Sequence, residues 1–118
     1  MKRGELYLAD LIPRSGSEQQ GTRPVIVVSH DGFNETPGWR SIIVVPISTS
    51  AVQASRGPTA IPLAKGIGGL KKDSIALCHQ VTTLDRAKLT QRLGSLSSKV
   101  MGDIENGLRA ALDLTREQ

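Results

Sequence analysis

The chain has 118 residues, enough for one domain with one modest hydrophobic core, and folding should bury roughly two-thirds of the surface that the unfolded chain exposes. Fifteen lysines and arginines against 11 aspartates and glutamates give a formal charge of +4, which favours a polyanionic partner but is also common in proteins that bind none. A single cysteine, Cys78, excludes an intramolecular disulfide framework and a site built from several thiolates, and no apolar run approaches the ~20 residues of a membrane span. These features predict one domain over residues 1–118 in a reducing cytoplasm, with no membrane anchor.

β-Branched residues separated by Gly, Pro and Ser dominate the first two-thirds of the chain, a pattern typical of a compact antiparallel sheet or barrel. The pattern predicts five strands, at Glu5–Asp10, Pro24–Ser29, Ser41–Pro46, Thr59–Leu63 and Ser74–Val81. The connections between them are polar or Gly-rich and mostly longer than a tight hairpin needs: Pro13–Thr22, Asp31–Arg40, Thr49–Pro58 and Ala64–Asp73. Long loops on a small barrel usually carry the function.

Helical periodicity is concentrated at the C-terminus. Val100, Ile104, Leu108 and Leu112 recur every four residues, and Ser97 or Ser98 can cap the start of the helix. We expect this apolar stripe to cover one open side of the barrel. The sequence therefore predicts a mainly β fold with a C-terminal helix.

A polar loop between two glycines precedes the second predicted strand, with the sequence Gly16-Ser17-Glu18-Gln19-Gln20-Gly21-Thr22-Arg23-Pro24. Arg23 stands at the root of that strand, where a rigid sheet would hold its guanidinium group in place for a phosphate. A structural ion pair between Arg23 and Glu18 explains the same residues. Both interpretations stay open at this point.

Several short blocks follow one another along nearly the whole chain. The first is Arg3-Gly4-Glu5-Leu6-Tyr7, which is followed by the loop that ends in Arg23-Pro24-Val25. The later blocks are Val44-Val45-Pro46-Ile47-Ser48-Thr49, Gly68-Gly69-Leu70-Lys71-Lys72-Asp73-Ser74, Cys78-His79-Gln80-Val81-Thr82-Thr83-Leu84-Asp85 and Arg92-Leu93-Gly94-Ser95-Leu96. In their order and spacing these blocks resemble the MazF/PemK family of toxins.

The resemblance implies a small SH3-like barrel of the CcdB/Kid/MazF type and a homodimer. It also implies a sequence-specific endoribonuclease, an mRNA interferase that cuts single-stranded RNA and is neutralised by a cognate antitoxin whose acidic tail lies in the RNA groove. The expected products are a 2′,3′-cyclic phosphate, or the 3′-phosphate, and a 5′-OH.

The resemblance further implies that catalysis rests on Arg23 and on the hydroxyl of Ser48, where most relatives have Thr. An arginine can neutralise the charge that builds on the phosphoryl oxygens, and a hydroxyl adds one hydrogen bond. Because a guanidinium holds its proton too tightly to be an easy base, Glu18 is our candidate to orient Arg23 or to take the proton. Alternatively, Ser48-Thr49-Ser50 is merely a turn that satisfies its own backbone.

Further candidate contacts with RNA are Gln19, Thr49, Gln80, His79, Lys71 and Lys72. Relatives commonly carry an acidic residue at the position of His79. Strand alternation places His79 on the face of Ile75 and Leu77, which favours packing over a role as proton donor or RNA contact. For the two lysines, a solvated loop is the alternative.

Phe33 and Trp39 share one predicted loop, and either can stack a base. The favoured interpretation is that one of them plugs the barrel edge or helps to form the dimer contact. The two histidines, His30 and His79, and Cys78 lack the spacing of metal ligands, so neither a metal nor another cofactor is expected. We read His30 as a turn or surface residue.

Two other functions fit the same fold. A CcdB-like poison of DNA gyrase needs no arginine and hydroxyl that converge on a phosphate, and its activity resides in C-terminal residues. The C-terminal residues Asp113–Gln118 do not resemble such an ending. A non-catalytic RNA-binding barrel is the third alternative.

Overall fold

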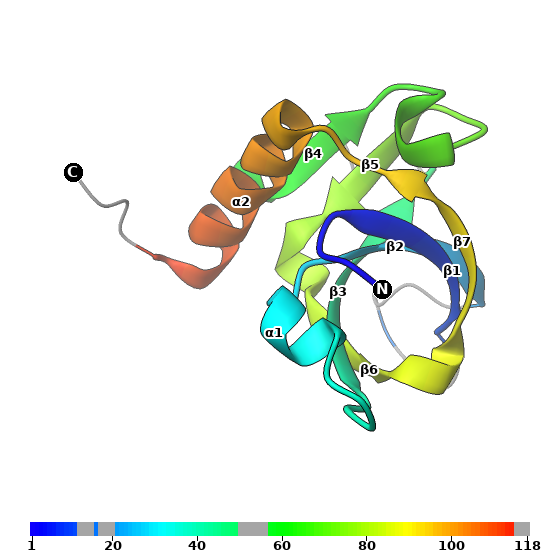
Figure 1. The fold of residues 1–118 in the computed structure, drawn as a ribbon. Helices are drawn as coiled ribbons and strands as arrows, with labels where there is room; N and C mark the ends of the chain where they lie inside the picture. Colours follow the sequence, from blue (N-terminus) through cyan, green and yellow to red (C-terminus); the bar gives the residue numbers. More distant parts are fainter. Residues whose placement is uncertain (12–15, 17–20, 50–56, 115–118) are drawn as a thin grey trace.

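A computed structural model describes residues 1–11, 16, 21–49 and 57–114 of the chain. Figure 1 shows a strongly curled antiparallel sheet with one long helix on its outside. Seven strands are assigned within the described residues: β1 (Glu5–Asp10), β2 (Thr22–Val27), β3 (Ser41–Ser48), β4 (Ala60–Leu63), β5 (Ser74–Leu77), β6 (Thr82–Asp85) and β7 (Leu89–Ser95). The predicted mainly β fold with a C-terminal helix is confirmed.

The longest strand, β3, connects the two parts of the curled sheet. The strand order is β4-β5-β3-β2-β1-β7, and β6 also pairs with β3. The first half of β3 pairs with β6, from Ser41 opposite Asp85 to Val44 opposite Thr82, whereas its end pairs with β5. Within the described residues no pairing joins β4 to β7, so the sheet has the curl of a barrel without closing.

Among the described residues, the core consists of three apolar clusters, of which the two larger lie on the two faces of β2 and β3 and the smallest joins β4 to β5. Val25 and Val27 belong to the first cluster, inside the curl, and Ile26 between them belongs to the second. This alternation follows from the period of two along a strand. Because both faces are covered there, the second half of β2, Val25–Val27, is a continuous apolar run rather than an alternating one.

The C-terminal helix α2 (Ser98–Leu112) covers the second cluster by packing on β4 and on the short 3₁₀ turn η3 (Cys78–Gln80). Its N-cap is Ser97, whose side chain accepts a hydrogen bond from the Val100 amide at 3.2 Å, as predicted. The described part of the chain contains no helix long and apolar enough to cross a membrane.

The predicted apolar stripe of α2 is correct at its centre and wrong at its end. Ile104 is fully buried, whereas Leu112 is 53% exposed, because the last turn of the helix lies beyond the core. Gly107 faces η3 so closely that an added Cβ would lie 2.6 Å from the Cys78 Sγ. Burial raises the pKa of the Cys78 thiol to about 12, so this thiol stays protonated at neutral pH.

Strand β1 has the predicted bounds, while β2 begins and ends earlier and β3 runs two residues further than predicted. The predicted strand Ser74–Val81 is wrong in its second half. It ends at Leu77, and the chain turns through η3 before β6 begins. Neither β6, β7 nor the short helix α1 (Asp31–Asn34) is predicted from the sequence.

Candidate functional site

A glycine-rich turn positions two lysines beside the sheet. The turn η2 (Ile67–Gly69) packs its backbone directly on β7: a Cβ on Gly69 would lie 2.2 Å from the Leu93 carbonyl oxygen, and one on Gly94 would lie 2.6 Å from the Gly68 backbone. Gly69 also has a φ of 83°, which glycine adopts at no steric cost. The sequence Gly68-Gly69 therefore holds the following residues, Lys71 among them, against β7.

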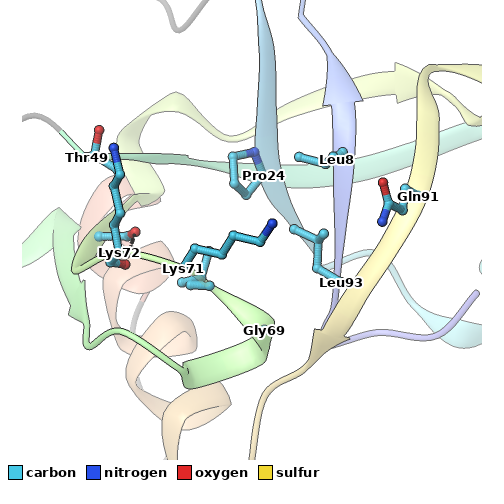
Figure 2. A pocket seen from close by; sticks show the side chains of 10 residues that line it. Leu8, Pro24, Thr49, Gly69, Lys71, Lys72, Gln91 and Leu93 are labelled. Atoms are coloured by element: carbon cyan, nitrogen blue, oxygen red, sulfur yellow. Dashed lines mark hydrogen bonds between the residues drawn. The ribbon is translucent and has the colours of Figure 1, made fainter.

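A pocket of about 310 Å³ opens between this turn and strands β1, β2 and β7 (Figure 2). Its lining is mostly apolar, with polar and charged groups among the rest: Leu8, Pro24, Thr49, Gly69, Leu70, Lys71, Lys72, Ser74, Gln91 and Leu93. A second hollow of about 490 Å³ shares Thr49 and Ser74 with the first and extends along β4 and the start of β5.

The wall formed by β7 is tied to β1 by an ion pair. Arg92 Nε lies 2.7 Å from Glu5 Oε2, and Glu5 Oε1 also accepts from the Lys2 amide and the Tyr7 hydroxyl. Burial by itself would raise the pKa of Glu5, but the hydrogen bonds from Arg92 and the Lys2 amide lower it overall. The carboxylate is therefore charged at neutral pH and can hold this pair of strands together.

The two predicted catalytic residues lie near each other in the register of the sheet. In the β2–β3 ladder Val25 pairs with Pro46, and the same register continued by two residues places Arg23 opposite Ser48. Arg23 lies on β2 with its side chain exposed to solvent. The sheet thus brings the predicted arginine and hydroxyl to the same end of two adjacent strands.

The two hydroxyls at this end of β3 differ in exposure. The sequence predicts Ser48 just after the strand, whereas in the structure Ser48 is the last residue of β3. It is only 4% exposed. Thr49 follows the strand, is exposed and lines both hollows. Pro24 and Thr49, the chain neighbours of Arg23 and Ser48, form part of the pocket wall, while the side chains of Arg23 and Ser48 do not.

Lys71 and Lys72 line the pocket, and their predicted contact with RNA stays a prediction. In Figure 2 the Lys71 side chain extends from the turn toward β2 and β7. Within the described parts of the chain, neither ammonium group has an acidic partner. Two positive charges are therefore available beside Thr49. The predicted contributions of Glu18 and Gln19, and the proposed ion pair between Arg23 and Glu18, lie outside the described residues.

In a single chain of the protein, His79 and Gln80 do not line this pocket. They belong to η3, which follows the far end of β5, and the four residues of β5 span about 13 Å. The prediction that His79 packs beside Leu77 is wrong, because the strand ends at Leu77 and the turn directs the imidazole outward. His79 is exposed, and its Nδ1 lies 3.1 Å from the Thr59 hydroxyl.

Phe33 and Trp39 form an exposed aromatic pair at the opposite end of β3. Their ring centroids lie 4.9 Å apart, and the two side chains are 52% and 39% exposed. The Trp39 indole nitrogen donates to the Ser41 carbonyl at 2.7 Å, which fixes the pair beside the first residue of β3. The prediction is that one ring plugs the barrel edge or helps to form the dimer contact. Because both rings are exposed, its first part is wrong, and the dimer contact stays a prediction. His30 caps α1 at the surface, accepting from the Gly32 amide at 2.7 Å.

Sequence reasoning missed the part of the pocket that β7 contributes, Gln91 and Leu93. These residues come beside the other lining residues through the pairing of β1 with β7, in which Leu8 lies opposite Gln91. Their only sequence signal is the Arg92–Leu96 block, which gives no role to Gln91. Among the described residues, no group of three or more His, Cys, Asp or Glu side chains is arranged to hold a metal ion.

Comparisons with known proteins place these features in a family. Residues 2–112 match the model of the PemK-like, MazF-like toxin of type II toxin-antitoxin systems. The chain is 37% identical over 114 residues to an Endoribonuclease MazF of Staphylococcus saprophyticus, covering 97% of this chain and 92% of that protein. Solved structures with the same fold include a mycobacterial endoribonuclease in complex with its cognate antitoxin, with a TM-score of 0.79, 22% identity and 99% of both chains covered. Another is MazF of Deinococcus radiodurans, with a TM-score of 0.78, 23% identity and 97% of both chains covered.

Proposed function

Because the chain belongs to the PemK-like, MazF-like toxin family of type II toxin-antitoxin systems, we propose that it is a sequence-specific endoribonuclease that cuts single-stranded RNA. The observation that carries the proposal is the placement of Arg23. Its exposed guanidinium group stands on a rigid strand opposite Ser48, next to a pocket lined by Thr49 and two lysines. This is an arrangement suited to a phosphate in an RNA backbone.

In the proposed reaction the ribose 2′-oxygen attacks the adjacent phosphorus, and the bond from phosphorus to the 5′-oxygen breaks. The 2′-hydroxyl loses its proton and the departing 5′-oxygen gains one, which leaves a 2′,3′-cyclic phosphate and a 5′-OH. Arg23 stabilises the negative charge that develops on the non-bridging oxygens. The hydroxyls at the end of β3 orient the phosphate, and Glu18 stays the candidate for orienting Arg23 or accepting the proton.

Two partners of the chain and its place of action belong to the proposed function. A cognate antitoxin is supported by the mycobacterial structure, which is a complex with one, and an acidic segment would find Lys71 and Lys72 beside the pocket. A homodimer is supported by the exposed aromatic pair Phe33–Trp39. The cytoplasm as its place of action is supported by the lone, buried Cys78.

The gyrase-poison alternative gains no support, because the family and the curated relatives are MazF-type toxins named as endoribonucleases. One experiment separates the readings. The purified chain is incubated with mixed-sequence RNA in EDTA, and its effect on DNA gyrase is assayed in parallel. Cleavage with 5′-OH ends supports the proposal, whereas intact RNA with arrested gyrase favours the alternative.

The same assay tests the role of Arg23. Arg23→Ala should lower the cleavage rate by about 10²–10³-fold, because one preorganised donor to the phosphate is lost. Arg109→Ala is the control, since it removes the same charge from α2 at a side chain that lies outside the pocket. If a folded Arg23→Ala protein cuts RNA at the parental rate, the proposed centre is wrong.

A further inference from the structure

We propose that the pocket between η2, β1, β2 and β7 binds one nucleobase of the RNA next to the scissile phosphate, and that Gln91 reads the edge of this base. This inference rests on the proposed function and adds a specificity-determining residue to it. The position of the pocket, its size and lining, and those of its polar groups that lack partners among the described residues support this role.

The position of the pocket ties it to the proposed site of cleavage. Pro24 and Thr49, two of its lining residues, directly follow Arg23 and Ser48 in the chain. Side chains of adjacent strand residues point to opposite faces, so Arg23 and the pocket residue Pro24 share one end of β2 but not one face. A phosphate held by Arg23 lies at that strand end, and the RNA passes round the end for an adjacent base to reach the pocket. The base attached beside that phosphate is thus the group of the RNA that can enter the pocket.

The size and lining fit a single base. A volume of about 310 Å³ lies at the lower end of the ~300–1,000 Å³ typical of small-ligand pockets, which suits one flat ring system. Leu8, Pro24 and Leu93 offer apolar surfaces from three adjacent strands (Figure 2). Extruded bases are commonly packed between apolar side chains in this way, and single-stranded RNA presents its bases unpaired.

Gln91 is the group in the pocket that can distinguish bases. Its side chain lies on β7 opposite Leu8, is exposed, and has no hydrogen-bond partner among the described residues. A side-chain amide offers donors and an acceptor together, the combination that pairs with the edge of a base. Lys71, by contrast, carries a point charge that suits any phosphate and reads no sequence.

These two roles predict different defects. Gln91→Ala should relax the preference for one base at a single position beside the cut by about 5- to 100-fold, the discrimination expected from a paired amide. Lys71→Ala should slow cleavage of all RNAs alike and flatten the dependence of binding on salt. Thr90→Ala is the matched control on the same strand, because Thr90 lies outside the pocket and bonds to the Leu8 carbonyl.

The measurement uses a pool of random single-stranded RNA, cut by the parent protein and by each variant, with the new 5′-OH ends sequenced. Loss of preference at one position in Gln91→Ala, with the other positions unchanged, supports the assignment. An unaltered pattern of preferences overturns it. A parent protein that leaves the pool intact instead refutes the proposed function.

If Gln91→Ala does not cleave, a 2′-O-methyl RNA pool, which cannot undergo attack by the 2′-oxygen, gives the same information through binding. The bound fraction is sequenced for the parent and for Gln91→Ala. A preference present in the parent and absent at one position in the variant supports the proposal, while identical preferences in both proteins contradict it.

Discussion

At the end of β3, the neighbouring hydroxyls of Ser48 and Thr49 differ in accessibility. Replacing each one by alanine separates a catalytic role from a binding role. Ser48 is 4% exposed, so a phosphate can reach its hydroxyl only from the end of the strand. Thr49 is exposed and lines the pocket. We expect Ser48→Ala to lower kcat and Thr49→Ala to raise KM, since the first removes a transition-state contact and the second a binding contact.

Ser48→Thr should keep the parental kcat, because the hydroxyl is retained. The added methyl group enters a buried position, so it should lower stability by about 1–3 kcal/mol if the strand end cannot adjust. Single-turnover cleavage and urea unfolding measure the two effects. If Thr49→Ala loses kcat while Ser48→Ala does not, the catalytic position is shifted by one residue from our assignment.

His79 is exposed and lies beyond the far end of β5, so its replacement should change little. We expect His79→Gln to leave the unfolding free energy within about 0.5 kcal/mol of the parent, the usual effect of an exposed substitution. The pH–rate profile of cleavage should keep its shape. The check is a single-turnover profile of both proteins across pH 5–8, where an unperturbed histidine titrates. A lost alkaline limb in His79→Gln would show that the imidazole donates a proton to the leaving oxygen.

At the scale of elements, the boundaries that the sequence predicts well are those marked by local chemistry. Strand β1 is preceded by a glycine, and α2 begins at the capping Ser97 as predicted. The turn η3 carries no such mark, because Cys78 continues the apolar pattern of β5 and is buried against α2. The strand ends at Leu77 just before Cys78 packs on the helix, and a local pattern does not contain that tertiary contact.

The residues of the candidate site likewise fall into those that local sequence motifs predict and one that only a long-range strand pairing brings in. Arg23, Ser48, Thr49 and the lysines follow from short motifs that stay local in the chain, and the sheet brings them to one end of β2 and β3. Gln91 enters the pocket through the pairing of β1 with β7, which joins residues more than eighty positions apart. Because β7 is not predicted, its contribution to the pocket is not predicted either.

The contact between α2 and η3 gives a test with a built-in control, since α2 contains two glycines. An added Cβ at Gly107 would lie 2.6 Å from the Cys78 Sγ and 3.0 Å from Ile61, while one at Gly102 meets nothing within 4 Å. Gly102→Ala should therefore stabilise the protein by about 0.5–1 kcal/mol through helix propensity. Gly107→Ala gains the same propensity but should be destabilising overall, because overpacking costs about 1–3 kcal/mol.

Urea unfolding of the parent and both variants measures these differences. The Cys78 thiol provides an independent readout, because it should be unreactive toward thiol reagents in the folded parent and become more reactive when the helix is displaced in Gly107→Ala. Equal stabilisation by the two alanines would mean that α2 does not pack on η3 in solution.

At the scale of the whole molecule, one chain leaves large apolar side chains uncovered on several elements. Phe33, Trp39, Ile43, Leu112 and Leu114 are all exposed within the described residues. Exposed aromatic side chains are enriched where proteins associate, and a small β protein with open strand edges is often completed by a two-fold partner. We therefore expect a homodimer at micromolar concentration, with a sedimentation mass twice the 12.6 kDa of one chain.

The aromatic pair allows the location of this contact to be measured as well. The sequence has a single tryptophan, so the emission of Trp39 reports on its own surroundings and should shift to longer wavelength as dilution separates the subunits. Phe33→Ser should weaken the dimer, because it removes the ring that packs on Trp39, while Leu112→Ser, at nearly the same exposure, should not. A dimer whose tryptophan emission is unchanged on dissociation would place the contact elsewhere on the molecule. A 12.6 kDa monomer under these conditions would contradict the dimer itself, and with it a substrate groove shared between two chains.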